Sequence, residues 1–212
     1  MKEWRMLPEA TKINLIVTPF LTFACILGID IHTPSLPSMV NFFHSHIDDL
    51  QLALPLIIFG AGLGIIIWAP VSDRLGRKNL LIASTLLVIL SSTLAIFCSH
   101  IIPFLILRVL QGFGSGASMC LGRVVAADML NKHQFMIIGP ITGLITGMAP
   151  MIAPIIGGYI ETAIGWQGCF LFYSLATTLS LAFFIINFQE TAPKTKRITS
   201  PIQQYVHIFT SR

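Results

Sequence analysis

Two charged residues interrupt long apolar runs of this chain, and their side chains are the first candidates for chemistry. Asp30 is the acid of the first run, and Arg108 lies in the fourth run, roughly 10 Å from its start at 1.5 Å rise per residue. A carboxylate in an apolar medium costs about 2.5–3.5 kcal/mol, which makes Asp30 a functional candidate. We predict that Asp30 binds and releases a proton. We expect Arg108 to pair with Asp30 or with a backbone carbonyl; the alternative is that Arg108 only ties the two runs together.

Polar residues beside this pair are candidates for binding a small molecule. His32 follows Asp30 after one residue, and Gln111 lies one helical turn beyond Arg108. We predict that His32 and Gln111 line a substrate cavity. A structural role for Gln111 is an equal alternative.

No metal site, cofactor or catalytic centre is predicted. The string His44-Ser45-His46 with Asp48 and Asp49 has the composition of a metal site, but a solvated loop is the preferred interpretation. The four cysteines lack metal-ligand spacing. We find no Ser/His/Asp, Cys/His or phosphate-loop arrangement, and therefore do not expect an enzyme.

The elements that must position these residues are predicted from composition. Of 212 residues, 54% are apolar and 10% are charged, whereas about a quarter of the residues in a soluble domain are charged. A helix that crosses a bilayer core needs roughly 20 apolar residues. We therefore predict an all-α membrane protein with six transmembrane helices. Their approximate bounds are Ile13–Ser35, Leu52–Val71, Leu80–Ser99, Ile101–Ala127, Phe135–Ile160 and Trp166–Phe188.

The basic residues outside these runs all lie on one side of the predicted membrane. Lys and Arg occur before the first run, between the second and third, between the fourth and fifth, and after the sixth. The connections 41–51, around His100 and 161–165 contain neither Lys nor Arg. Lys and Arg are retained in the cytoplasm during insertion, so both termini are predicted to be cytoplasmic, in a bacterial inner (plasma) membrane. Because the basic clusters border apolar runs, the net charge of +4 indicates a lipid bilayer as partner and not nucleic acid.

Several strings resemble the motifs of one transporter family. Residues 69–78 read APVSDRLGRK, residues 108–116 read RVLQGFGSG, residues 149–158 read APMIAPIIGG, and Glu190-Thr191 follows the sixth run. In order, they resemble the GxxxDRxGRK motif, the RxxQGxGxG motif, the proton-antiporter motif and the Glu-Thr pair of the major facilitator superfamily. Residues 30–37, DIHTPSLP, resemble the DxYLPxLP stretch of its Bcr/CflA-type drug exporters.

The motifs assign expected roles to further residues. A network of ion pairs is expected to gate transport, and Gly76 is expected to permit its tight turn. The prolines of the fifth run, Pro150 and Pro154, are expected to bend the antiporter helix at a gate, with an ordinary packed kink as an equal alternative. Glycines spaced by four residues share one helix face and are expected to permit close helix contact. The gating set is Asp73, Arg74, Gly76, Arg77, Lys78, Arg123 and Asp128; the antiporter set is Pro150, Pro154, Gly157 and Gly158; the spaced glycines are Gly60, Gly64, Gly112, Gly116, Gly139, Gly143 and Gly147.

The resemblance also implies an architecture and a function. Members of the family have twelve spans, so this chain is identified as the N-terminal half of the major facilitator fold, with two inverted three-helix repeats. We expect a membrane domain at 1–190 and a cytoplasmic tail at 191–212. The implied function is secondary transport, in which drugs or other small molecules are exported in exchange for protons, together with a C-terminal six-helix half or another copy. The alternatives are a truncated, non-transporting membrane fragment and half of a metabolite or sugar transporter.

Overall fold

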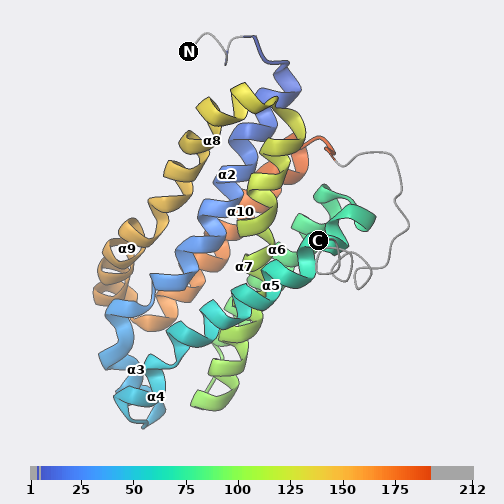
Figure 1. Ribbon diagram of the computed structural model, residues 1–212. Helices are drawn as coiled ribbons and strands as arrows, with labels where there is room; N and C mark the ends of the chain where they lie inside the picture. Colours follow the sequence, from blue (N-terminus) through green and yellow to red (C-terminus); the bar gives the residue numbers. More distant parts are fainter. Residues whose placement is uncertain (1–3, 5, 192–212) are drawn as a thin grey trace.

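The computed structural model describes residues 4 and 6–191, and its elements in this part of the chain are helical (Figure 1). The predicted tail 191–212 lies outside the described residues except for Thr191, and the boundary of the membrane domain stays a prediction. The elements are α2 (Glu9–Asp30), the 3₁₀ turn η1 (Thr33–Ser35), α3 (Leu36–Phe43), α4 (Ile47–Gln51), α5 (Ala53–Leu75), α6 (Arg77–Ala95), α7 (Ile101–Met129), α8 (Lys132–Gly147), α9 (Ala149–Ile164) and α10 (Trp166–Asn187).

Six helical segments in the described residues are long and apolar enough to cross a membrane, as the sequence predicts. Three of these spans are single helices longer or shorter than the predicted run by a few residues. The first, second and fifth spans each combine shorter helices. The spans are Glu9–Phe43, Ile47–Leu75, Arg77–Ala95, Ile101–Met129, Lys132–Ile164 and Trp166–Asn187.

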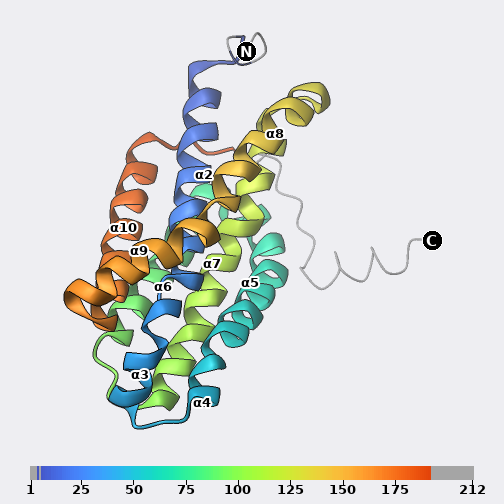
Figure 2. The same ribbon diagram turned by 90° about the vertical axis from the view of Figure 1, so that its left-hand side faces the viewer.

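Helices α2 and α7 lie at the centre of the bundle, and their partners come from opposite halves of the chain (Figure 2). The first-span helix α2 packs against α8, α9 and α10 of the second half, whereas the fourth-span helix α7 packs against α5 and α6 of the first half. Helices α2 and α7 also contact each other. Because each half supplies the central helix for the other, the two halves of the described chain form one interlocked bundle.

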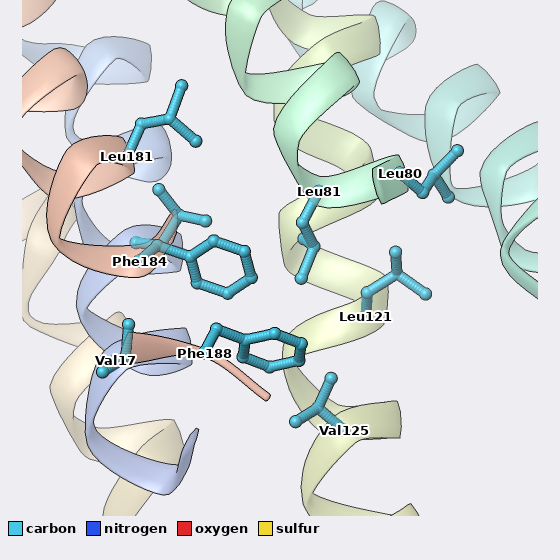
Figure 3. Packing of buried hydrophobic residues seen from close by; sticks show 9 residues of the cluster. Val17, Leu80, Leu81, Leu121, Val125, Leu181, Phe184 and Phe188 are labelled. Atoms are coloured by element: carbon cyan, nitrogen blue, oxygen red, sulfur yellow. The ribbon is translucent and has the colours of Figure 1, made fainter. Parts of the chain in front are cut away.

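One end of the bundle, which we call the basic end, contains the turn between α5 and α6 with its basic residues. Close to it, apolar side chains from α2, α6, α7 and α10 form a buried cluster (Figure 3). The rings of Phe184 and Phe188 stack with centroids 4.4 Å apart, which carries the cluster past the end of α10. Its buried members are Val17, Leu21, Leu80, Leu81, Leu121, Val125, Leu181, Phe184 and Phe188.

The spaced glycines serve different purposes in α5, α7 and α8. A Cβ atom on Gly60 or Gly64 of α5 would collide with a backbone carbonyl of α7, and a Cβ atom on Gly112 or Gly116 of α7 would collide with a carbonyl of α5. These glycines therefore permit backbone contact between α5 and α7, as expected. The expectation is wrong for the α8 stripe. A Cβ atom on Gly143 or Gly147 would meet no atom within 4 Å, and a Cβ atom on Gly139 would meet only the Phe135 side chain of its own helix.

The fifth span is broken next to its first proline. Helix α8 ends at Gly147, and α9 begins at Ala149 with Pro150 in its first turn, where the missing N–H of proline breaks no helical hydrogen bond. Pro154 lies inside α9. Helix α9 continues past the predicted end of this run to Ile164, so the predicted connection 161–165 is wrong: it is helical except for Gly165, which has a φ of 86°.

Candidate functional site

The guanidinium of Arg108 is fully buried and binds the end of α2. Its Nη1 atom donates to the carbonyl of Gly28 at 3.1 Å, and its Nη2 atom donates to the carbonyl of Ile29 at 2.9 Å. The last four carbonyls of a helix have no partner within the helix, and their dipoles attract a cation. Arg108 therefore caps the C-terminus of α2.

Asp30 is the residue that follows these two carbonyls and ends α2. Its side chain is half-buried and forms no hydrogen bond or ion pair in the described part of the chain. Of the two partners expected for Arg108, the structure places the backbone carbonyls in contact and not the Asp30 carboxylate. The two charges still interact electrostatically. The C-terminus of α2 thus repels a negative charge on Asp30, whereas the Arg108 guanidinium attracts it.

His32 and Gln111 are buried in contact with Arg108 and are not among the residues that line the pocket described below. His32 is 2% exposed, and its Nδ1 atom lies 3.2 Å from Nη2 of Arg108. Since a guanidinium can only donate, Nδ1 accepts and the imidazole proton lies on Nε2. Gln111 is 1% exposed, accepts from Arg108 at 2.7 Å and donates to Ser92 Oγ of α6 at 3.1 Å. Both side chains therefore help to position the Arg108 guanidinium, and the expected contact with substrate stays a prediction.

A pocket of about 480 Å³ lies nearer the basic end, between α2, α7 and α8. This volume falls within the usual range of small-molecule sites. Its α2 wall, formed by Pro19, Thr22 and Ile26, shares one helix face with Asp30, which lies one turn beyond Ile26. The pocket and Asp30 therefore follow each other along the same side of α2. The other lining residues are Met119, Gly122, Arg123, Phe135, Met136, Gly139, Pro140, Thr142, Gly143 and Thr146.

Most of the predicted gating residues meet at the basic end. The guanidinium of Arg77 contacts Asp73 Oδ1 through Nη1 at 2.8 Å and Asp128 Oδ2 through Nε at 3.2 Å. Gly76, between α5 and α6, has a φ of 85°, which favours glycine at this turn. Arg74 lies in the last turn of α5. The network joins α5, α6 and α7.

Arg123 does not belong to this network. It lines the pocket, and in the described residues it forms no ion pair. The prediction grouped Arg123 with Asp128 because both lie near the end of the fourth run. Five residues turn a helix by about 140°, so the two side chains point to different faces of α7.

Glu190 is a member of the basic end whose contacts the sequence did not predict. Its two carboxylate oxygens accept from the backbone N–H groups of Arg77 at 3.0 Å and Lys78 at 3.1 Å, which caps the N-terminus of α6. Lys78 Nζ donates to the carbonyl of Phe188 at 2.9 Å. The segment after α10 is thereby bound to the turn between α5 and α6.

Asn14 binds the same segment to α2. Its amide donates to the carbonyl of Gln189 at 2.8 Å and accepts from the N–H of Gln189 at 3.0 Å. Asn14 is fully buried. An Asn in an otherwise apolar run was the available signal for this contact, because a buried amide needs hydrogen-bond partners.

Comparison with known families places these motifs in context. A family model described as Major Facilitator Superfamily matches residues 20–212. The chain belongs to the Major Facilitator Superfamily. It is a multi-pass membrane protein of this superfamily, with six candidate spans in its described part.

Relatives of this superfamily chain are named for drug resistance. It is 30% identical over 173 residues to a chloramphenicol resistance protein of Pseudomonas aeruginosa, covering 81% of this chain and 41% of the relative. It is 27% identical over 192 residues to a bicyclomycin resistance protein homolog of Haemophilus influenzae, covering 90% and 48%. It is 23% identical over 174 residues to multidrug resistance protein D of Escherichia coli, covering 80% and 44%. These relatives are consistent with the Bcr/CflA type, and the chain spans less than half of the length of each.

The remaining predicted residues of this superfamily chain surround the end of α2. Gly157 of α9 lies so close to the carbonyl of Ile31 that no Cβ atom would fit, and Gly158 lies beside Pro34. Pro150 and Pro154 precede this contact along α9. The two glycines of the antiporter set therefore pack against the residues that follow Asp30, which is compatible with both the gate and the packed kink.

Proposed function

We propose that this chain is one half of a secondary transporter that exports drug-like small molecules in exchange for protons. Asp30 is the proton-binding group, and Arg108 holds the end of α2 that presents it. The observation that carries the proposal is the shared face of α2, on which Asp30 follows the pocket-lining residues Thr22 and Ile26. Binding of a proton to Asp30 and binding of a molecule in the pocket can therefore compete, because both occur on the same face of α2.

The chemistry of the pocket supports a drug-like substrate. Its walls combine apolar side chains such as Phe135 and Met119 with the hydroxyls of Thr142 and Thr146 and the charge of Arg123. Apolar walls with a few polar groups are typical of small-molecule sites. The printed names of the relatives, which concern resistance to chloramphenicol, bicyclomycin and several drugs, support the same substrate class.

The share of each relative that this chain matches supports a second six-helix unit. The matched relatives are more than twice as long as the part they share with this chain. We infer that a second six-helix unit, either a C-terminal half or another copy, completes the transport path. We place the assembly in a bacterial inner membrane with both termini in the cytoplasm, in accordance with the position of the basic residues.

An efflux assay in drug-sensitised cells tests the proposal. Cells express the chain alone, or with the C-terminal half of a matched relative, and extrusion of a fluorescent drug is followed with and without a proton gradient. We expect uphill extrusion from the paired halves, and its loss in the Asp30→Asn variant. Asp48→Asn, in the short helix α4 away from the pocket, is the matched control.

The outcomes separate the proposal from its alternatives. Proton-driven extrusion that survives Asp30→Asn would remove Asp30 as the coupling group. Extrusion of a sugar or metabolite in place of drugs would change the substrate class. A chain that reaches the membrane but extrudes nothing with any partner would be the non-transporting fragment.

A further inference from the structure

The pocket between α2, α7 and α8 has a cation in its wall and no acid among the described residues that line it. Arg123 of α7 is exposed there, and its guanidinium has no hydrogen bond or ion pair in the part of the chain that the structure describes. Of the nearest acids, Asp128 binds Arg77, and Asp30 lies about two helical turns beyond the lining residue Thr22. The charge of Arg123 is therefore available to a bound molecule.

The hydroxyl groups of the pocket donate to carbonyls of the chain and leave no proton for a ligand. Thr22 Oγ1 donates to a carbonyl of α2 at 3.0 Å, and Thr142 Oγ1 and Thr146 Oγ1 donate to carbonyls of α8 at 2.8 Å and 3.1 Å. A hydroxyl has a single hydrogen, so these threonines offer a ligand only acceptor oxygens. A guanidinium carries several N–H donors and cannot accept. Among the described lining residues, Arg123 thus supplies the side-chain donors for a ligand.

Glycines of α8 leave room for a ligand beside this guanidinium. Gly139 and Gly143 line the pocket, and a Cβ atom on Gly143 would meet no atom within 4 Å. A molecule that occupies this space contacts apolar walls, which include Met119 and Phe135, and has its polar group next to Arg123. The part of the glycine stripe that does not pack against another helix therefore widens the pocket.

We propose that this pocket selects its ligand by charge: it takes small apolar molecules that carry an anionic or neutral acceptor group, and it rejects cations. A carboxylate, with its planar pair of oxygens, matches the fork of N–H groups on Arg123. An ammonium group would be repelled by the guanidinium, and no acid in the described lining compensates. The preference describes an exported substrate only if the proposed function holds, but binding itself can be measured without transport.

Equilibrium dialysis of the full chain in lipid nanodiscs tests the preference. The probes are phenylbutanoate, phenylbutanamide and phenylbutylammonium, which share one apolar body and differ in charge, and empty nanodiscs correct for partition into lipid. We expect phenylbutanoate to bind about tenfold more tightly than the ammonium, with the amide between them, because a hydrogen bond to a charged group is stronger. In Arg123→Gln, phenylbutanoate should bind no better than the amide. Absent binding, equal binding of the three probes, or a preference that survives Arg123→Gln would overturn the proposal.

Filling the space beside Gly143 tests where the probes bind. Gly143→Leu should weaken binding of phenylbutanoate and of the amide several-fold, because the leucine occupies the pocket. Gly62→Leu in α5 is the matched control and should leave binding unchanged, since a Cβ atom there also meets no atom within 4 Å but Gly62 does not line the pocket. Binding that is equal in both variants would contradict the site.

The efflux assay described above separates this proposal from the proposed function. Charge-selective binding that is lost in Arg123→Gln, without extrusion by any pairing of halves, would support the pocket's preference and contradict the transport proposal. Extrusion that depends on Asp30, together with equal binding of the three probes, would do the reverse.

Discussion

The Nε atom of Arg77 lies 3.2 Å from Oδ2 of Asp128, although the two residues are 51 positions apart in the chain. The pair connects the start of α6 to the end of α7. Arg77 also reaches Asp73 in α5, but the Asp73 side chain is 48% exposed and that of Asp128 is 21% exposed. Water screens an exposed ion pair more strongly. Asp128 should therefore be the stronger partner of Arg77.

Double-mutant cycles on unfolding of the full chain in detergent test this order. We expect a coupling free energy of about 1–3 kcal/mol between Arg77→Ala and Asp128→Asn, as for a shielded network. For Arg77→Ala with Asp73→Asn we expect about 0.3–0.5 kcal/mol, the usual value for an exposed pair within one turn. A larger coupling to Asp73 than to Asp128 would contradict the assignment.

Removing the charge of Glu190 should loosen the start of α6. Glu190→Gln loses a carboxylate that accepts two backbone N–H groups at a helix N-terminus, and a capping interaction of this kind contributes about 1 kcal/mol. We expect the amides of Arg77 and Lys78 to exchange roughly fivefold faster. The control is Glu9→Gln, whose side chain is 82% exposed, and it should leave both rates unchanged.

The six spans could be predicted because the membrane demands long apolar helices, and each run has the required length. The ends of the runs were less certain, since a helix can continue through polar residues when they find partners. Glu161 is such a case: its contact with Ser38 lies within α9, in a stretch predicted as a connection. Composition alone does not reveal a hydrogen bond between segments 123 positions apart.

The candidate site was predicted less completely than the fold. Buried charges are expensive, so Asp30 and Arg108 stood out from composition. The direction in which a helical side chain points depends on packing, which composition does not show. In the structure Gln111 contacts Arg108, and Arg123 lines the pocket. The choice of Arg108 between Asp30 and backbone carbonyls depended on where α2 ends, which apolar periodicity does not resolve.

Two glycines offer a matched test of helix packing. Gly112→Ala would place a methyl group against the carbonyl of Ile57 in α5, whereas Gly143→Ala in α8 would place it in open space. We expect Gly112→Ala to lower the free energy of unfolding by about 1–3 kcal/mol, as overpacking does. Gly143→Ala should be neutral or should raise it by up to about 1 kcal/mol, because alanine favours helix. Thermal unfolding in detergent measures both, and equal losses would disprove the close α5–α7 contact.

Arg108→Lys should release the end of α2 while keeping a positive charge. A lysine ammonium is a compact point charge and cannot serve the carbonyls of Gly28 and Ile29 together with Gln111, as the planar guanidinium does. Each buried acceptor left without a donor should cost about 1–3 kcal/mol in unfolding measurements. Arg123→Lys, at an exposed guanidinium without an ion pair in the described residues, should have little effect.

The part of α2 in which hydrogen exchange becomes faster in Arg108→Lys distinguishes a helix cap from a simple contact between α2 and α7. If Arg108 caps α2, Arg108→Lys should speed hydrogen exchange at the N–H of Ile31, which closes the last turn of α2 on the carbonyl of Leu27. Exchange in the middle of α2 should stay unchanged. A uniform increase along α2 would mean that Arg108 only holds the helices together. Because Asp30 belongs to the turn in question, the local result would also mean that Arg108 sets the position of the proposed proton-binding carboxyl relative to the pocket.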